Sequence, residues 1–175
     1  MKFFFEAFLK NKLLILRNLR NIRSIFLFKK IILHFGFKNS IKNTKQVLSG
    51  CLVLGLLTFG KGLILQSKKS LMILKIRRGM VVSTKITLTK NNLYLFLNRF
   101  LLINYFKMGN SIFLNRKSID KSTVTLRISD LYVFPEIERF FDFCDDLPFL
   151  TITLVSNEFS DNSFKKLLTF LIFIS

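Results

Sequence analysis

The sequence predicts an α+β domain in which helices cover one face of a sheet. Half of the 175 residues are apolar, so the chain can bury a core and is not expected to be disordered. Strand-type alternation and helix-type apolar stripes are interleaved irregularly, which favours this class over regular β-α-β units. At this length we expect a single domain over residues 1–175.

The first third is predicted to contain two helices and a strand. Residues 1–28 form a basic helical segment, because apolar residues recur at helical spacing between Phe3 and Leu19 with lysines and arginines between them. Residues 31–36 indicate a short buried strand that ends at glycine. A helix follows over 39–57, before the chain breaks at Gly60 and Gly62. The expected buried face of that helix includes Ile41, Val47, Leu48 and Leu52.

The middle third is predicted to contain two strands, a helix and a loop. The strands are 71–76 and 85–89, and a helix begins directly after the second. The helical stripe is the clearest in the chain and consists of Leu93, Phe96, Leu97, Phe100 and Leu101. Residues 105–122 lose this periodicity and are rich in Asn, Ser, Lys and Gly, so we expect a loop there.

The last third is predicted to hold two strands, a turn and a helix. Apolar residues alternate with polar ones from Thr123 to Ser129, as in a half-buried strand. Pro135 disfavours a helical conformation at Phe134, so a turn is expected over 134–137. A second strand covers 150–155, and a helix is expected to follow Ser160.

Positive charge is concentrated in the first 119 residues, which hold 23 Lys and Arg and one acid, a net charge of +22. The remaining residues carry a net charge of −4, and the whole chain +18. A folded protein with such one-sided charge repels itself unless a polyanion neutralises it. The charge therefore predicts a nucleic-acid partner first and an anionic membrane second.

The sequence holds no constellation typical of an enzyme, a cofactor site or a metal site. His34 is the only histidine, and we interpret it as a structural residue or a polar RNA contact. Cys51 and Cys144 lack metal-ligand spacing and are expected to be free thiols. A cluster of three acids is interpreted as a solvated surface: Asp142, Asp145 and Asp146. No charge-free apolar run reaches the roughly 20 residues of a membrane span.

Candidate RNA-binding residues are the cations near predicted strand ends and turns, with adjacent polar side chains. Lysine and arginine release counterions from phosphates, and short polar groups hydrogen-bond to phosphate and ribose. The set consists of Lys29, Lys30, Lys38, Lys61, Gln66, Lys68, Lys69, Lys75, Arg77, Arg78, Lys85 and Thr87.

The order and spacing of several motifs resemble ribosomal protein five of the large subunit, a family that binds 5S rRNA. The similarity extends over roughly residues 8–172. The matching segments are Ser67–Ser70, Lys75–Met80, Lys85–Thr89, Leu93–Phe100, Phe134–Ile137 (the family's FPEI) and Ile152–Val155.

This resemblance implies a mostly antiparallel, curved sheet and a place in the central protuberance of the large subunit. It implies contacts with large-subunit rRNA, with 5S rRNA where the ribosome contains one, with neighbouring ribosomal proteins and with small-subunit protein thirteen. It also adds His34 and Thr89 to the RNA-binding set, at positions where the family has Asn and Arg.

The resemblance further implies that the 105–122 loop faces P-site tRNA, although here it is shorter and lacks the family's arginine-rich sequence. The candidate tRNA-facing residues are Lys107, Asn110, Arg116 and Lys117. Abundant Phe, Lys, Asn and Ile indicate A/T-rich codons, so we expect an organelle genome, a mitochondrial one before a plastid one, and a place in the mitochondrial matrix. The alternative source of this composition is an A/T-rich nuclear or bacterial genome.

Two alternatives from other functional classes follow from the same residues. A membrane-associated protein would use the amphipathic Phe3–Leu19 helix and basic patches on anionic lipid. An RNA-modifying enzyme would need a cofactor-binding loop or an acid–base pair, and the sequence contains neither.

Overall fold

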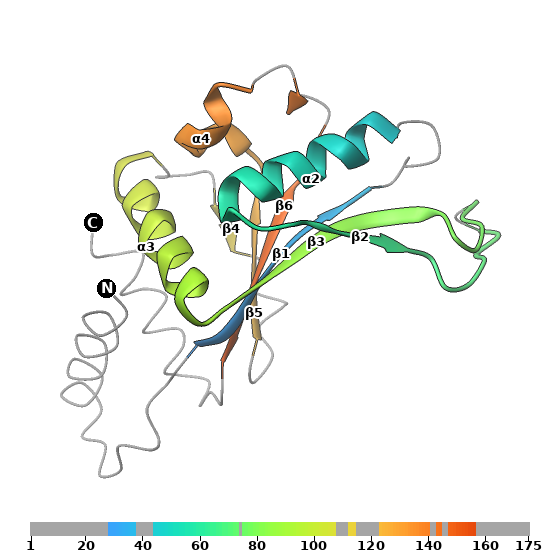
Figure 1. Ribbon diagram of the computed structural model, residues 1–175, viewed down its shortest axis with the longest axis horizontal. Coiled ribbons are helices and arrows are strands. Elements are labelled where there is room, and N and C mark those ends of the chain that lie inside the picture. Colours follow the sequence, from blue (N-terminus) through green and yellow to red (C-terminus); the bar gives the residue numbers. More distant parts are fainter. Residues whose placement is uncertain are drawn as a thin grey trace, which may run out of the picture.

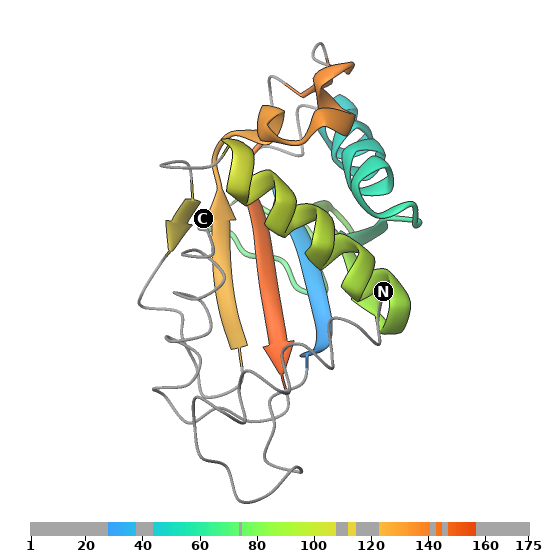
Figure 2. The same ribbon diagram turned by 90° about the vertical axis from the view of Figure 1, so that its left-hand side faces the viewer.

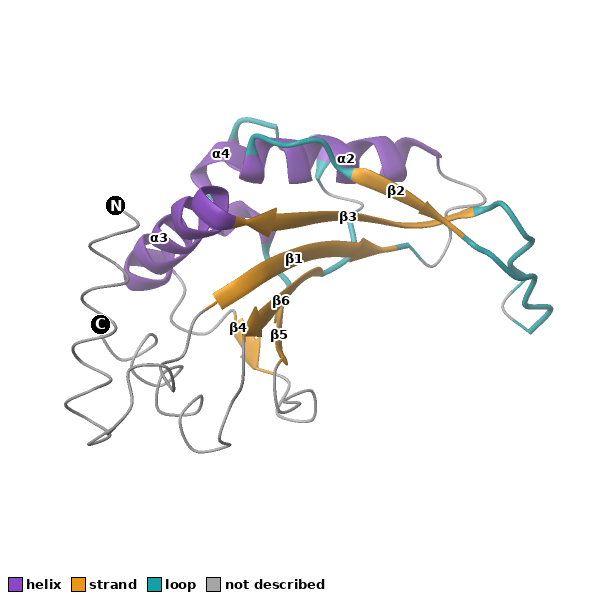
Figure 3. Ribbon diagram, turned by 60° about the horizontal axis from the view of Figure 1, so that its bottom comes forward, coloured by secondary structure: helices purple, strands orange, loops and turns teal. Residues whose placement is uncertain are grey.

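The computed structural model describes residues 28–37, 44–73, 75–107, 112–114, 123–140, 143–144 and 147–156, with side chains left undescribed at 101–107 and 112–114. In these residues, one six-stranded sheet carries helices on one face (Figures 1 and 3). The predicted α+β class is therefore confirmed. The elements follow in the order β1 (Phe28–Gly36), α2 (Thr44–Thr58), β2 (Leu63–Gln66), β3 (Val81–Thr89), α3 (Lys90–Lys107), β4 (Ile112–Leu114), β5 (Thr123–Ile128), the 3-10 turn η3 (Leu131–Val133), α4 (Pro135–Glu138) and β6 (Leu150–Ser156).

The strands are arranged in the order β2-β3-β1-β6-β5-β4, and every neighbouring pair is antiparallel. The central pair joins β1 to β6, from opposite ends of the sequence, and the strands run side by side beneath α3 (Figure 2). Ile31 lies opposite Leu88 on one side and Leu154 on the other. This register places apolar side chains of three strands in one row against the helices.

The core lies between the sheet and the helices. In β1, Ile31, Leu33 and Phe35 are fully buried, while Lys29 and Lys30 are exposed. The predicted stripe of α3 is confirmed for its described members, because Leu93, Phe96, Leu97 and Phe100 are all buried. The predicted strands at 31–36, 85–89, 123–129 and 150–155 are confirmed, although β5 ends at Ile128, one residue early, β1 and β6 are longer by three residues and one, and β3 begins four residues early at Val81.

The buried face predicted for α2 was wrong in part. Leu48 is 66% exposed and Leu52 40% exposed. The face that packs on the sheet consists instead of Val47, Gly50, Val53, Leu54, Leu57 and Thr58. Apolar residues occur on all sides of this helix, so their periodicity could not select the face that the sheet covers.

The strand predicted over residues 71–76 does not form. Leu71 and Ile76 make one isolated antiparallel bridge, and Met72 and Ile73 are 93% and 97% exposed. These residues form the far end of the extension that links β2 and β3. Apolar and β-branched composition favours a strand there. The chain instead turns back on itself, because Leu71 and Ile76 pair with each other and the Lys75 N–H donates to the Met72 carbonyl at 3.0 Å.

The predicted 105–122 loop and the turn at Pro135 also need correction. α3 continues to Lys107, and β4 pairs with β5. Phe134 is extended (φ −83°, ψ 117°), as predicted, but Pro135 then begins the short helix α4. Proline is suited to a first helical position because its missing N–H has no partner there.

Some predictions lie outside the described residues. They are the Phe3–Leu19 helix, Ile41 and the helix after Ser160. The predicted N-terminal segment overlaps the sheet by one residue, since Phe28 opens β1.

Candidate nucleic-acid interface

The sheet face opposite the helices carries a polar row that crosses four strands. His34 in β1 lies opposite Lys85 in β3 and opposite Thr151 in β6. Thr151 lies in turn opposite Arg127 in β5. The row Lys85–His34–Thr151–Arg127 thus combines two cations, an imidazole and a hydroxyl.

Two further rows run parallel to the first. One is Thr87–Ile32–Thr153–Thr125, and the other is Thr89–Lys30–Val155–Thr123. We call the three rows together the polar face. Side chains alternate across a strand, so the residues between the buried apolar ones all point to the polar face. Threonine is the most frequent residue type among them.

The polar face offers donors that match a sugar–phosphate backbone. Lys30, Thr87, Thr89 and Arg127 are exposed, and His34 and Lys85 are half-buried. Hydroxyls can both donate and accept hydrogen bonds, which suits ribose 2′-OH groups and phosphate oxygens. The arrangement has the chemistry of a surface that reads RNA shape.

His34 contributes hydrogen bonding here instead of charge. Burial lowers the pKa of His34 below its ordinary value of 6.5, and the nearby positive charge of Lys85 lowers this pKa further. The imidazole is therefore neutral at physiological pH, with one nitrogen that donates and one that accepts.

A second basic surface is the extension between β2 and β3, residues 67–80, which we call the basic hairpin. Ser67 ties its base together, because the N–H of Ser67 donates to the Met80 carbonyl at 2.8 Å and its hydroxyl donates to the Arg77 carbonyl. Gly79 also donates to the Ser67 carbonyl at 2.9 Å, with a positive φ of 86° that glycine adopts readily. The hairpin extends beyond the helices (Figure 1). Its exposed cations are Lys68, Lys69, Lys75, Arg77 and Arg78.

The structure groups most of the predicted residues into these two surfaces. Lys30, His34, Lys85, Thr87 and Thr89 lie on the polar face, and Gln66 ends β2 where the basic hairpin begins. Lys29 at the start of β1 and Lys61 before β2 are exposed apart from either surface. Lys107 is the last residue of α3. Four predicted residues lie outside the described part: Lys38, Asn110, Arg116 and Lys117.

Sequence reasoning missed the half of the polar face that lies on β5 and β6. Thr125 and Arg127 were predicted as polar positions of a half-buried strand, and Thr151 and Thr153 lie in the second predicted strand, but none was predicted as a neighbour of His34. Their alternation with apolar residues was visible in the sequence. The missing information was the pairing of β6 with β1, which joins segments more than 100 residues apart.

The described residues give little support to a metal site or a membrane span. They contain no cluster of three metal-ligating side chains, and no helix among them is long and apolar enough to cross a membrane. Cys51 is half-buried and Cys144 is buried, neither in a disulfide, and burial raises the pKa of the Cys51 thiol. The three clustered aspartates lie outside the described ranges.

Comparison with known proteins places the chain in the class of large ribosomal subunit proteins. It is 30% identical to the large ribosomal subunit protein uL5 of Trichlorobacter lovleyi over 152 residues, which cover 86% of this chain and 84% of the relative. It is 29% identical to uL5 of Prochlorococcus marinus strain MIT 9515, over 94% of this chain and 92% of the relative. It is 36% identical to uL5m of Reclinomonas americana, over 65% of this chain and 63% of the relative. No protein-family model matches the chain.

The chain belongs to the uL5 family of large ribosomal subunit proteins. This confirms the resemblance seen in the sequence motifs and the prediction that the protein is not an enzyme.

Proposed function

We propose that this protein is a structural component of a mitochondrial large ribosomal subunit and binds rRNA through the polar face and the basic hairpin. A structural role in the large subunit follows from family membership. The mitochondrial assignment is supported by the similarity to uL5m of Reclinomonas americana and by an amino-acid composition rich in the residues of A/T-rich codons.

The observation that carries the rRNA-binding proposal is the register across β3, β1, β6 and β5. It brings cations and hydroxyls from distant segments onto one side of the sheet. The helices occupy the opposite side (Figure 3). RNA on the polar face would neutralise charge that otherwise repels itself.

Finer contacts belong to the same proposal. We place the protein in the central protuberance, against large-subunit rRNA and against 5S rRNA where the ribosome contains one. Small-subunit protein thirteen would meet it across the subunit interface. The P-site tRNA contact would involve Lys107 at the end of α3 and the residues that follow.

The proposal is tested by reversing charge on the basic hairpin. The variant K69E/R77E/R78E should fold, because all three side chains are exposed, yet fail to enter large subunits in a sedimentation assay. Opposed charges on phosphates would repel it. The control K90E/R139E changes exposed cations in the helix layer and should be incorporated normally. Normal assembly of the hairpin variant would remove this surface from the RNA interface.

A further inference from the structure

The helix α2 is apolar on every side, but the sheet covers only one side of it. Leu48 and Leu52, one turn apart on the side of α2 away from its buried face, are 66% and 40% exposed, and Phe59, directly after the helix, is 81% exposed. We call these three residues the outer stripe. Helices that are apolar all round are typically buried all round. The outer stripe is therefore a surface that fits an additional partner.

The charges around the outer stripe are positive. Lys45 lies three residues before Leu48, on the same helical face, and is exposed, and Lys61 is exposed just beyond Phe59. No acidic residue occurs in α2. The stripe thus has a lysine near each end, and a complementary surface would be apolar with acidic residues at its border.

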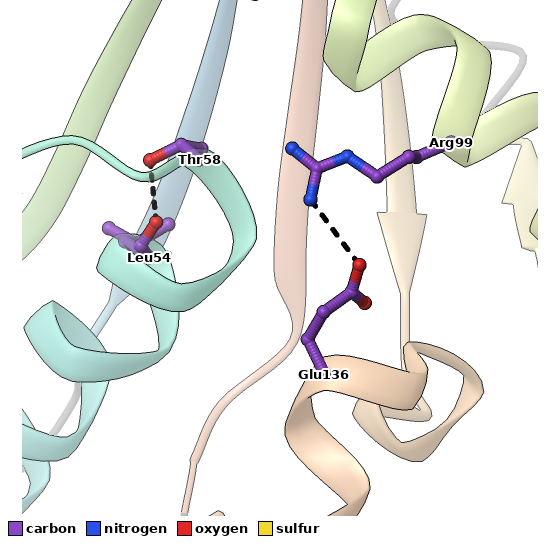
Figure 4. A network of polar contacts seen from close by, with 4 residues as sticks. All are labelled: Leu54, Thr58, Arg99 and Glu136. Atoms are coloured by element: carbon purple, nitrogen blue, oxygen red, sulfur yellow. Dashed lines mark hydrogen bonds and ion pairs between the residues drawn. The ribbon is translucent and has the colours of Figure 1, made fainter.

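Phe59 has a backbone conformation that residues other than glycine disfavour. Its φ is 54°, a left-handed value that glycine adopts more easily, and its N–H donates to the Gly55 carbonyl at 2.7 Å. The Arg99 guanidinium lies over the ring, 4.9 Å from its centroid, and also pairs with Glu136 at 3.3 Å (Figure 4). A strained, exposed aromatic that neighbouring elements fix in place is typical of a binding surface.

Three other occupants fit the outer stripe less well than a protein. α2 has 15 residues, fewer than the roughly 20 that span a bilayer. The two leucines offer RNA no hydrogen-bond donors, in contrast to the polar face on the other side of the sheet. A second copy would bring its own lysines, and two chains that each carry a net charge of +18 would repel each other.

We propose that the outer stripe docks an amphipathic helix of another large-subunit protein, whose apolar face is bordered by Asp or Glu. The inference rests on the proposed place of the chain in the large subunit. Leu48 and Leu52 form a ridge with one-turn spacing, the geometry by which helices pack. The RNA and the protein partner would then occupy opposite sides of the molecule.

The occupant can be identified by photo-crosslinking in assembled particles. The full-length chain carries p-benzoylphenylalanine in place of Leu48 and is incorporated into large subunits, which are purified and irradiated. We expect a crosslink to a peptide of another protein that combines apolar residues with Asp or Glu at helical spacing. Crosslinks to rRNA, to lipid or to a second copy would overturn the inference, as would no crosslink in subunits that contain the chain. Absence of the chain from the subunits would contradict the proposed function instead.

A second measurement links the crosslink to the outer stripe. In the variant L48Q/L52Q/F59G, occupancy of the crosslinked protein in purified subunits should fall about tenfold or more, as for the loss of an aromatic anchor. The control L95Q changes a residue of α3 that is 48% exposed and lies in neither the outer stripe nor an RNA-binding surface, and it should leave that occupancy unchanged. Thermal melts of the free chains check that both variants fold. Equal occupancy in the two variants would rule the outer stripe out as the docking site.

Discussion

Phe59 shows how a single backbone angle can be tested apart from side-chain contacts. With φ at 54°, the backbone of Phe59 has a left-handed conformation, which a Cβ atom disfavours and which glycine therefore adopts most readily. Replacement by alanine or by glycine removes the ring and its contact with Arg99 equally. Because only alanine keeps the Cβ, F59G should be more stable than F59A by about 1 kcal/mol.

Urea unfolding of the two Phe59 variants measures this difference directly. Leu57, two residues earlier and 2% exposed, gives the contrast, because L57A should lose about 2–5 kcal/mol as a core truncation. If F59A equalled or exceeded F59G in stability, residue 59 would not hold the left-handed conformation.

His34 predicts a specific pH dependence of stability. Burial, and then Lys85, lower its pKa in the folded chain below the ordinary value of 6.5, so the unfolded chain binds the proton more readily. The contribution of His34 is therefore fully present above about pH 6.5 and is lost as the pH falls toward the folded pKa.

The variant H34N isolates that contribution, since His34 is the only histidine of the chain. Between pH 7.5 and 5 the free energy of unfolding of the wild type should fall more than that of H34N. Chemical unfolding at a series of pH values gives both curves. Parallel curves would show that His34 has an ordinary pKa in the folded chain.

The packing of α2 against the sheet depends more on Gly50 than on Gly55. A Cβ at Gly50 would lie 2.8 Å from the Phe37 ring and 3.2 Å from the Thr84 hydroxyl. A Cβ at Gly55 would make only an ordinary contact, 3.5 Å from the Gly60 carbonyl oxygen. The two positions therefore differ in the space beneath the helix, while the gain in helix propensity from alanine is the same.

We expect G50A to destabilise the protein by about 1–3 kcal/mol, because overpacking exceeds the gain in propensity. G55A should instead stabilise it by up to about 1 kcal/mol. Thermal or urea unfolding of the pair decides this. Equal effects of the two substitutions would mean that α2 is not seated on Phe37 and Thr84 as described.

At the scale of the whole molecule, the sheet separates a cationic surface from an apolar one. The polar face and the basic hairpin carry the charges that suit RNA, and the outer stripe of α2 lies in the helix layer (Figures 1 and 3). The two surfaces should therefore respond independently to mutation.

Salt dependence of RNA binding tests this separation. For six to ten phosphate contacts, affinity of the wild type should fall about 10³–10⁵-fold between roughly 50 and 200 mM salt. K85A should lower the slope of log affinity against log salt by about 1, whereas L48Q/L52Q should leave it unchanged. Fluorescence anisotropy with a labelled rRNA stem-loop provides the slopes. A change of slope in the α2 variant would place RNA on the helix layer.

Local sequence was sufficient for elements whose two sides differ clearly. The alternation from Thr123 to Ile128 and the stripe from Leu93 to Phe100 each separate apolar from polar positions, so strand, helix and buried face could all be predicted. The cations of the basic hairpin were also visible, because they are close together in the sequence.

By itself the sequence determined the α+β class and the concentration of charge, because these depend on composition and on neighbouring residues, and the order of its motifs resembled one family. Only the tertiary structure decided which side of α2 is buried, that residues 71–76 lack a strand partner, and that Arg127 and Thr151 share a row with His34. The physical reason is that a helix with apolar residues all round has no preferred side, and a strand has no preferred neighbour, until distant segments pair.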